Sequence, residues 1–177
     1  MRASVFVGTS LDGYMARVGG AYDFLPAGGG EPHGYEEFFA SVDALVIGRN
    51  TYQVVLDIKP WPYGDKPVFV LSSRPLAEAP PGAVVERMSG SPEEIASALT
   101  HRGIEHVYVD GGATIQSFLN AGLIQRLTIT RVPIIIGQGI PLFGPTTRDI
   151  PLRHIATQHY ATGLVKSEYE ILSQPIR

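Results

Sequence analysis

"VYVDGGATIQSFLNAGLI", residues 107 to 124, joins a short apolar run to a helical pattern through two adjacent glycines. The segment 105–112 predicts a strand that ends on the glycine pair, and Gly122 is a typical helix stop. Three apolar residues of the intervening segment recur at the spacing of one helical face: Ile115, Phe118 and Leu119. A strand that passes directly into a helix is the repeating unit of an α/β sheet.

Two earlier stretches repeat this transition. "ALVIGRNTY", residues 44 to 52, ends an apolar strand on Gly48 and continues as a helix with apolar side chains at i, i+3, i+4 spacing. "KPVFVLSS", residues 66 to 73, predicts a third strand, which Arg74 follows. In open α/β sheets, ligands bind beyond the carboxyl ends of the strands, where helix N-termini offer free N–H groups to phosphate. Two arginines, several hydroxyls and a diglycine at such ends therefore predict a ligand with more than one phosphate.

The rest of the chain also alternates strand and helix patterns. Residues 17–34 hold six of the 20 glycines, and a loop of this length is typical of a lid or binding loop. Ser91, Pro92 and Glu94 form the pattern of a capped helix start with a capping box. The other expected elements are a strand at 3–8, a helix at 35–42, a strand at 126–136, and two antiparallel strands within 152–172 that turn at Thr162–Gly163. Because no repeat or linker divides the chain, we expect one α/β domain spanning residues 1–177.

Composition excludes several classes of function. The chain has 177 residues, of which 44% are hydrophobic and 18% charged, as in ordinary globular proteins. A net charge of −3 argues against a nucleic-acid-binding face. The absence of cysteine excludes disulfides and thiolate chemistry, and the five histidines lack metal-ligand spacing, so no metal is expected. No signal peptide and no apolar run of the ~20 residues needed to cross a membrane is evident, so a cytoplasmic protein without a membrane partner is expected.

Each strand end also has a purely structural interpretation. Thr51 could cap a helix rather than contact a phosphate. Ser72-Ser73-Arg74 could form a polar turn, and Gly111-Gly112 could serve close packing of strand against helix. The Rossmann and P-loop fingerprints are both absent. The recurrence of the pattern on successive strand–helix units is what favours a shared phosphate-binding site.

Four motifs, in their order along the chain, carry a resemblance to a known family. They are "TSLDGYMA", "VIGRNTY", "VFVLSSR" and "VDGGATIQSFLNAGLIQRLTITRVPIIIGQGIPLF". The chain resembles the dihydrofolate-reductase-like superfamily, and within it most closely the RibD C-terminal domain family of riboflavin biosynthesis. The resemblance covers about residues 3 to 172. It implies a three-layer α/β/α fold with a mixed, mostly parallel eight-stranded sheet and a C-terminal antiparallel hairpin.

The resemblance also implies that NADPH lies across the carboxyl ends of the strands. The residues expected at the adenosine-side phosphates are Arg49 and Thr51, and those at the 2′-phosphate are Ser72, Ser73 and Arg74. Gly48 is expected to belong to the cofactor site as well. The residues expected to cradle the pyrophosphate are Gly111, Gly112, Ala113, Thr114 and Ile115, and those near the nicotinamide are Val7, Gly8 and Ala16. The planar fork of an arginine suits a 2′-phosphate because it donates two parallel hydrogen bonds.

Three acidic positions are candidates on the substrate side. Members of the family carry an acidic residue before the glycines, facing the substrate, which makes Asp110 the candidate catalytic residue; a buried hydrogen-bonding role is the alternative. Folate-reducing relatives use a carboxylate of the first helix, where Glu36 and Glu37 are both available, although a solvated acidic face explains them as well. Asp12 is either a turn residue before Gly13 or a substrate contact.

The activity implied by the resemblance is NADPH-dependent hydride transfer to a small planar heterocycle or carbonyl compound. The nearest named activity is 5-amino-6-(5-phosphoribosylamino)uracil reduction. Relatives with this activity hold the ribose phosphate with basic residues, but residues 35–44 contain none and residues 51–61 only Lys59. Trp61 and Tyr63 could line a pocket for a planar substrate or belong to the core. Dihydrofolate or pterin reduction, and NADPH binding without catalysis, remain open.

The strand expected at 126–136 contains Pro133, which predicts an edge strand or a bulge. A long apolar edge is normally covered, and the resemblance implies pairing between subunits there. A homodimer is therefore expected.

Overall fold

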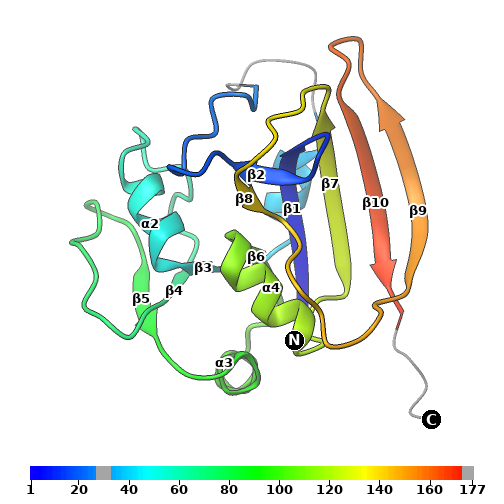
Figure 1. Ribbon diagram of the computed structural model, residues 1–177. Coiled ribbons are helices and arrows are strands. Elements are labelled where there is room, and N and C mark those ends of the chain that lie inside the picture. Colours follow the sequence, from blue (N-terminus) through cyan, green and yellow to red (C-terminus); the bar gives the residue numbers. More distant parts are fainter. Residues whose placement is uncertain (27–32, 173–177) are drawn as a thin grey trace.

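An eight-stranded mixed sheet forms the centre of the computed structural model, which describes residues 1–26 and 33–172 (Figure 1). The strand order is β5-β4-β3-β6-β1-β7-β10-β9. The bounds are β1 (Arg2–Ser10), β3 (Ala44–Gly48), β4 (Val68–Leu71), β5 (Val85–Met88), β6 (His106–Asp110), β7 (Arg126–Val132), β9 (Leu152–His159) and β10 (Val165–Ile171). All neighbours from β5 to β7 are parallel, whereas β10 runs antiparallel to both β7 and β9. This confirms the expected mixed sheet with its C-terminal hairpin.

Helices cover both faces of the sheet. The four helices are α1 (Tyr35–Ala40), α2 (Arg49–Leu56), α3 (Pro92–His101) and α4 (Gly112–Asn120). Alternate residues of β3 divide between the faces, because successive side chains of a strand point to opposite sides. Val46 packs in the same core cluster as Ile95 of α3 and Phe118 of α4. Ile47 packs with Tyr52 of α2 and Phe38 of α1. We call the latter side of the sheet the α1/α2 face.

The start of α3 has the geometry that its sequence predicts. The hydroxyl of Ser91 accepts a hydrogen bond from the Glu94 N–H at 3.2 Å, and the Glu94 carboxylate accepts one from the Ser91 N–H at 2.8 Å. The hairpin turn around Gly163 is confirmed as well, since the Tyr160 N–H donates to the Leu164 carbonyl at 2.9 Å.

The prediction that β7 is an edge strand is wrong. Strand β7 pairs with β1 on one side and with β10 on the other, so it lies inside the sheet. It ends at Val132, so Pro133 follows the strand instead of interrupting it, and no hydrogen bond of the sheet is lost. The actual edge on this side of the sheet is β9, the outer strand of the hairpin, all eight residues of which are exposed.

A second, two-stranded sheet was not expected from the sequence. It pairs β2 (Tyr14–Ala16) with β8 (Ile140–Pro141), and it lies beside the N-terminal end of α4 (Figure 1). Asp12 supports this sheet, because its carboxylate accepts hydrogen bonds from the N–H groups of Ile136 at 3.2 Å and Gly137 at 2.8 Å. The Gly13 N–H also donates to the Ser10 carbonyl at 3.0 Å, so the turn interpretation of this segment is confirmed.

Within residues 1–26 and 33–172, no helix is long and apolar enough to span a membrane. Residues 27–32 of the expected 17–34 loop lie outside the described residues.

Candidate active site

The three strand ends singled out in the sequence lie side by side. Strands β4, β3 and β6 are consecutive neighbours and run parallel, so the segments after Leu71, Gly48 and Asp110 emerge at one edge of the sheet. Helix α2 begins directly after β3, and α4 begins two residues after β6. The predicted phosphate-binding residues are thus brought to one place.

The turns after β3 and β6 interlock through two glycines and two threonines. A Cβ atom on Gly48 would lie 2.9 Å from Thr114 Oγ1, and a Cβ atom on Gly111 would collide with Thr51 Oγ1. Each threonine hydroxyl therefore points at the glycine of the neighbouring turn. The prediction that Thr51 caps its helix is wrong, because α2 begins at Arg49 with Gly48 as the N-cap.

Helices α2 and α4 begin without a side-chain cap, in contrast to α3. Their N-cap residues are Gly48 and Gly111, neither of which has a side-chain acceptor for the first N–H groups. At α4 the Ile115 N–H donates to the Gly111 carbonyl at 2.8 Å, and the Ile115 side chain is fully buried. The N–H groups of Gly112, Ala113 and Thr114 precede it in the first turn and have no carbonyl acceptor within the helix. Two helix N-termini suited to an anion thus meet at one point.

The segment after β4 is a polar turn. The Ser72 hydroxyl accepts from the Arg74 N–H at 3.0 Å and lies 2.8 Å from the Arg74 carbonyl. Ser73 and Arg74 remain exposed. Arg87 of β5 also reaches this turn, since its guanidinium lies 3.5 Å from the Ser72 carbonyl. No pattern along the chain indicates Arg87, because its position depends on the pairing of β5 with β4.

The residues predicted near the nicotinamide lie in three different settings. The Val7 side chain is buried in the core on the α3/α4 side of the sheet. Gly8 faces the opposite side, where a Cβ atom would lie 2.8 Å from Leu25 Cδ2. Ala16 is in β2 and pairs with Ile140 of β8, and Ile140 in turn lies against Gly112. The small sheet therefore forms a wall beside the start of α4.

Asp110 ends β6 on the α1/α2 face, on the same side as Tyr108 two residues earlier. Its Oδ1 accepts a hydrogen bond from the Gly111 N–H at 2.7 Å. Burial raises the pKa of Asp110 to about 6, and the Gly111 hydrogen bond opposes this rise. Asp110 as a whole residue is half-buried. The hydrogen bond to one oxygen fits the buried hydrogen-bonding role, and the half-burial of the residue is compatible with a substrate contact.

Tyrosines from distant parts of the chain surround Asp110. Burial raises the pKa of Tyr35 to about 12, and the negative charge of Asp110 contributes to this rise. The same two causes, burial first, raise the pKa values of Tyr63 and Tyr108. Asp110 is therefore a weakly acidic carboxyl group in an aromatic environment.

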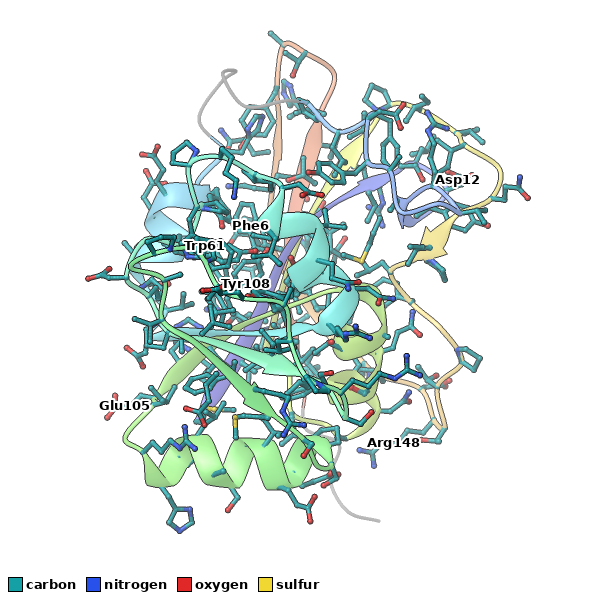
Figure 2. All side chains as sticks on the ribbon, turned by 90° about the vertical axis from the view of Figure 1, so that its left-hand side faces the viewer. Phe6, Asp12, Trp61, Glu105, Tyr108 and Arg148 are labelled. Atoms are coloured by element: carbon teal, nitrogen blue, oxygen red, sulfur yellow. The ribbon has the colours of Figure 1, made fainter. Side chains whose placement is uncertain are left out.

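These tyrosines belong to a larger aromatic cluster on the α1/α2 face. The ring of Phe6 stacks on Phe38 at 5.0 Å between centroids, and Trp61 meets Tyr63 edge-on at 5.2 Å. Figure 2 shows Phe6, Trp61 and Tyr108 gathered on one side of the molecule. Among the described residues, no acceptor lies within hydrogen-bonding distance of the buried Trp61 Nε1. The cluster thus combines the core rings of Tyr63 and Tyr108 with the half-buried ring of Trp61, whose N–H is buried and unpartnered.

Neither acidic residue of the first helix shares this environment. Glu36 and Glu37 are both exposed in the first turn of α1. The alternative of a solvated acidic face fits them.

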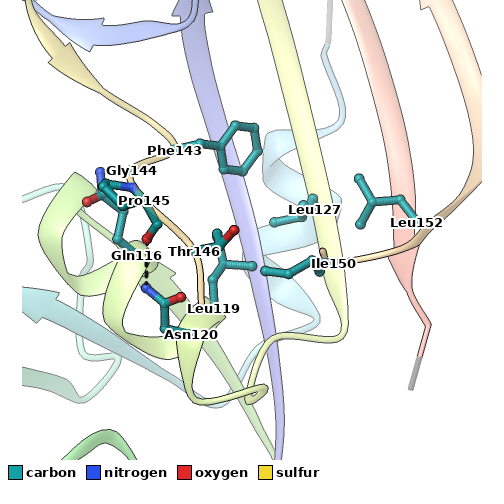
Figure 3. Close-up of a pocket in the computed structure, with 10 residues that line it drawn as sticks. All are labelled: Gln116, Leu119, Asn120, Leu127, Phe143, Gly144, Pro145, Thr146, Ile150 and Leu152. Atoms are coloured by element: carbon teal, nitrogen blue, oxygen red, sulfur yellow. Dashed lines mark hydrogen bonds between the residues drawn. The ribbon is translucent and has the colours of Figure 1, made fainter. Parts of the chain in front are cut away.

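A pocket of about 210 Å³ lies elsewhere, beside α4 on the opposite face (Figure 3). It is apolar, with Leu127, Phe143 and Ile150 among its lining residues. Asn120 Nδ2 donates to the Pro145 carbonyl at 3.3 Å at its rim. None of the predicted site residues lines it.

With this geometry in view, the chain can be compared with known proteins. The family model of the RibD C-terminal domain matches residues 4–166. The chain belongs to the RibD C-terminal domain family. Solved structures agree: a Shewanella sp. PV-4 protein, provisionally named as a riboflavin biosynthesis protein, is 38% identical with a TM-score of 0.88, over 98% of this chain and 100% of that one.

Two more distant structures share the fold of this RibD C-terminal domain protein. A Thermotoga maritima diaminohydroxyphosphoribosylaminopyrimidine deaminase/5-amino-6-(5-phosphoribosylamino)uracil reductase is 17% identical with a TM-score of 0.72; the match covers 97% of this chain and 56% of that one. A dihydrofolate reductase from Enterococcus faecalis, solved with NADP(H), is 16% identical with a TM-score of 0.64, over 97% of both chains. The expected dihydrofolate-reductase-like fold is thereby confirmed.

Proposed function

We propose that this protein is an NADPH-dependent reductase that transfers a hydride to a small planar heterocycle. The observation that carries the proposal is the meeting of two helix N-termini without side-chain caps at Gly48 and Gly111, one strand away from the exposed Arg74. A dinucleotide needs such anion-binding groups at two separated positions, for its pyrophosphate and its 2′-phosphate. The Enterococcus relative bound to NADP(H) supports the choice of cofactor.

The residues present fit this cofactor. The N–H groups of Gly112, Ala113 and Thr114 would hold the pyrophosphate, since the first turn of α4 has no side-chain cap. Arg49 and Thr51 would serve the adenosine-side phosphates from the start of α2. Ser73 and Arg74 would hold the 2′-phosphate, with Ser72 fixing their turn. Val7, Gly8 and Ala16 would lie near the nicotinamide. NADPH supplies the hydride, and the protein supplies binding, orientation and a proton.

In the proposed reaction Asp110 delivers that proton. Its Oδ1 is fixed by the Gly111 N–H, which orients the carboxyl group and leaves Oδ2 to face a substrate nitrogen or oxygen. A pKa of about 6 keeps a fraction of the group protonated near neutral pH. A general acid works best when its pKa lies near the operating pH. Ordinary aspartate, with a pKa near 3.8, would be almost fully ionised under the same conditions.

The surroundings of Asp110 favour a flat substrate without a phosphate. Tyr35 is exposed and Trp61 is half-buried, so these two rings present flat surface beside the buried Tyr63. Helix α1 carries no lysine or arginine that could bind a ribose phosphate. The 5-amino-6-(5-phosphoribosylamino)uracil reaction is thus the nearest named activity, and an unphosphorylated analogue of its ring is the proposed substrate class.

Dihydrofolate or pterin reduction fits less well. That alternative needs a carboxylate directed from the first helix toward the substrate, but Glu36 and Glu37 are exposed. Turnover measurements separate the other alternative, NADPH binding without catalysis, from a reductase activity.

We also propose that the protein is a homodimer, joined at β9. This edge strand exposes Leu152 and Ile155, at 41% and 40% of their surface. Uncovered strand edges invite pairing, so a second copy is the simplest cover. Light scattering at micromolar concentration should give twice the chain mass, and Ile155→Lys should lower it; a monomeric wild type would contradict the proposal.

The reductase proposal is tested by following NADPH absorbance with a panel of planar heterocycles, including pyrimidines and pterins. Turnover of a pyrimidine-type ring that is lost in Asp110→Asn supports it. Tight NADPH binding without turnover of any compound favours the non-catalytic alternative, and failure to bind NADPH overturns the cofactor assignment.

A further inference from the structure

A polar cavity lies on the α1/α2 face, at the start of β6. It has a volume of about 340 Å³, is partly open to solvent, and lies between α1 and the strands β1, β6, β7 and β10. Phe6 and Phe38 line it on the side toward Asp110, with their stacked rings 5.0 Å apart. We call it the α1 cavity. Because His106 begins β6 and Asp110 ends it, the cavity and the candidate active site lie at opposite ends of that strand.

Positive charge dominates the α1 cavity. Arg2, Arg126 and Lys166 line it, together with a single carboxylate, Glu168. The Lys166 ammonium lies 3.6 Å from the Glu168 carboxylate and also donates to the His33 carbonyl at 3.0 Å, so these two charges compensate each other. Within residues 1–26 and 33–172, no carboxylate is within ion-pair distance of either Arg2 or Arg126. Glu170, the cross-strand partner of Arg126, forms its ion pair with Arg153. Two exposed guanidinium groups thus line one cavity without an ion-pair partner in the described part of the chain.

The two arginines are placed to act together. Residues 4 and 126 are direct partners in the pairing of β1 with β7, and Arg2 precedes Ser4 by two positions on the same face. The two guanidinium groups thus reach the cavity from adjacent strands. Planar arginine forks on either side of a cavity are suited to a tetrahedral oxyanion, which accepts several hydrogen bonds at once.

Two hydrogen bonds compete for one ring nitrogen of His106. His106 is buried, with 7% of its surface exposed. Its Nδ1 lies 2.9 Å from Arg2 Nη2 and also 2.9 Å from the Ser41 carbonyl oxygen. Nδ1 can accept from Arg2 only when unprotonated, and can donate to Ser41 only when protonated. One of the two contacts is therefore always unfavourable while Arg2 stays on the ring.

An anion in the α1 cavity would remove this conflict. With Arg2 turned to the anion, Nδ1–H is free to donate to the Ser41 carbonyl. The other ring nitrogen, Nε2, lies 2.8 Å from the Ser4 hydroxyl, which is 3% exposed. If Nε2 also carries a proton, it donates to Ser4, and the Ser4 hydroxyl is free to donate to the anion. The groups that face the ring are Arg2, Ser4, Ser41, Phe38 and Asp43, whose carboxylate accepts from the His106 N–H at 2.8 Å.

We propose that the α1 cavity is a second ligand site, which binds the phosphate group of a small phosphate monoester or free inorganic phosphate between Arg2 and Arg126. The volume exceeds what a phosphate alone occupies, which leaves room for a sugar-sized substituent. Binding transfers the Arg2 guanidinium from His106 to the phosphate and favours the charged imidazole. This site does not depend on the proposed reductase activity, and it lies apart from the cofactor phosphates at α2 and α4.

Phosphate titrations at constant ionic strength test the proposal, with nuclear magnetic resonance of the histidine rings as the readout. His106 is assigned with His106→Gln. In the wild type, inorganic phosphate should shift the His106 ring signals saturably and raise the titration midpoint of the ring by about one pH unit, as a nearby negative charge does. Burial, together with the positive charge of Arg2, holds the pKa of His106 below its ordinary value without ligand. Ribose 5-phosphate is the second probe: tighter binding than inorganic phosphate identifies a monoester site, and equal binding identifies a phosphate site.

Matched variants separate this site from general anion binding. Arg126→Gln should weaken phosphate binding at least tenfold, whereas Arg148→Gln, the same charge change in an exposed loop, should leave it unchanged. Arg126→Lys keeps the charge without the fork and should show an intermediate loss; it also serves if Arg126→Gln folds poorly. Non-saturable shifts, or equal effects of Arg126→Gln and Arg148→Gln, would mean an adventitious ion only and would overturn the proposal.

The backbone amide signals of Gly111 and Gly112 report on the other end of the molecule in the same spectra. If phosphate moves only these signals, the α1 cavity is rejected while the cofactor proposal stands. If phosphate moves the His106 signals and NADPH moves neither glycine, the cofactor proposal fails while the α1 cavity stands.

Discussion

The hydroxyl of Thr51 fills the space that a side chain on residue 111 would need. Gly111 also has a φ of 95°, which residues with a side chain rarely adopt. The same contact is mirrored between Thr114 and Gly48, at 2.9 Å from an added Cβ. The turns after β3 and β6 are therefore locked together, and the starts of α2 and α4 are held in one fixed relation.

Replacing Gly111 with alanine should destabilise the protein by about 3 kcal/mol, because backbone strain adds to the clash with Thr51. Chemical denaturation measures the loss. Gly82→Ala is the matched control, since its φ is 82° but nothing lies within 4 Å of an added Cβ; it should cost about 1 kcal/mol. Adding Thr51→Ala to Gly111→Ala should recover part of the loss. An equal loss of unfolding free energy in Gly111→Ala and Gly82→Ala would show that the contact with Thr51 Oγ1 adds no destabilisation.

Replacing Arg74 with alanine should weaken NADPH binding by about ten- to a hundredfold, while NADH binding changes little. A hydrogen bond to a charged group contributes roughly 1.5–3 kcal/mol, which corresponds to that range. Fluorescence titration with both cofactors measures the effect. Arg102→Ala is the control, because Arg102 is also exposed but pairs with Glu86 at 2.7 Å. An unchanged preference for NADPH in Arg74→Ala would remove Arg74 from the 2′-phosphate site.

NADPH should slow hydrogen exchange at the starts of α2 and α4 more than at the start of α3. The first N–H groups of α2 and α4 have no side-chain cap, whereas Ser91 already occupies that position in α3. At a hundred times its dissociation constant, the cofactor should also stabilise the fold by about 2.7 kcal/mol. Exchange measured by mass spectrometry resolves the three helices. Equal protection of α3 would indicate global stabilisation rather than contact with the other two.

The strand–helix transitions and the capped start of α3 could be predicted from sequence because their signals are local. The apolar run before Gly111 and the spacing of Phe118 and Leu119 lie within a few residues of each other. The position of β7 inside the sheet could not be predicted in this way, since it depends on pairing with β1 and β10. Pro133 signalled the end of a strand, but a pattern along the chain cannot tell a strand end from a sheet edge.

The candidate site shows the same division. The three strand ends were recognisable by their glycines and hydroxyls, and the resemblance to the family supplied their roles. The tyrosines around Asp110 were not recognisable, because residues 35, 63 and 108 meet only after α1, the segment after α2 and β6 have packed together. The short strands β2 and β8 have two or three residues each, too few to show a period.

Replacing Asp110 with asparagine should stabilise the protein near pH 7 while it removes activity. The pKa of Asp110 rises from 3.8 to about 6 on folding, so the folded state holds its proton more tightly than the unfolded state. Stability is then lost as pH rises from about 4 to about 6, and above pH 6 the ionised, buried group costs up to roughly 3 kcal/mol, less for its partial exposure. Asparagine keeps the acceptor for the Gly111 N–H but cannot ionise, so it avoids this cost. Urea denaturation should show the variant to be more stable than wild type at pH 7 and equal to it below pH 4.

If Asp110 is the proton donor, wild-type kcat/KM should also fall as pH rises through about 6, and the variant should lose about a hundredfold or more in turnover. A variant less stable than wild type at pH 7 would instead show that the ionised carboxylate is a structural hydrogen-bond acceptor.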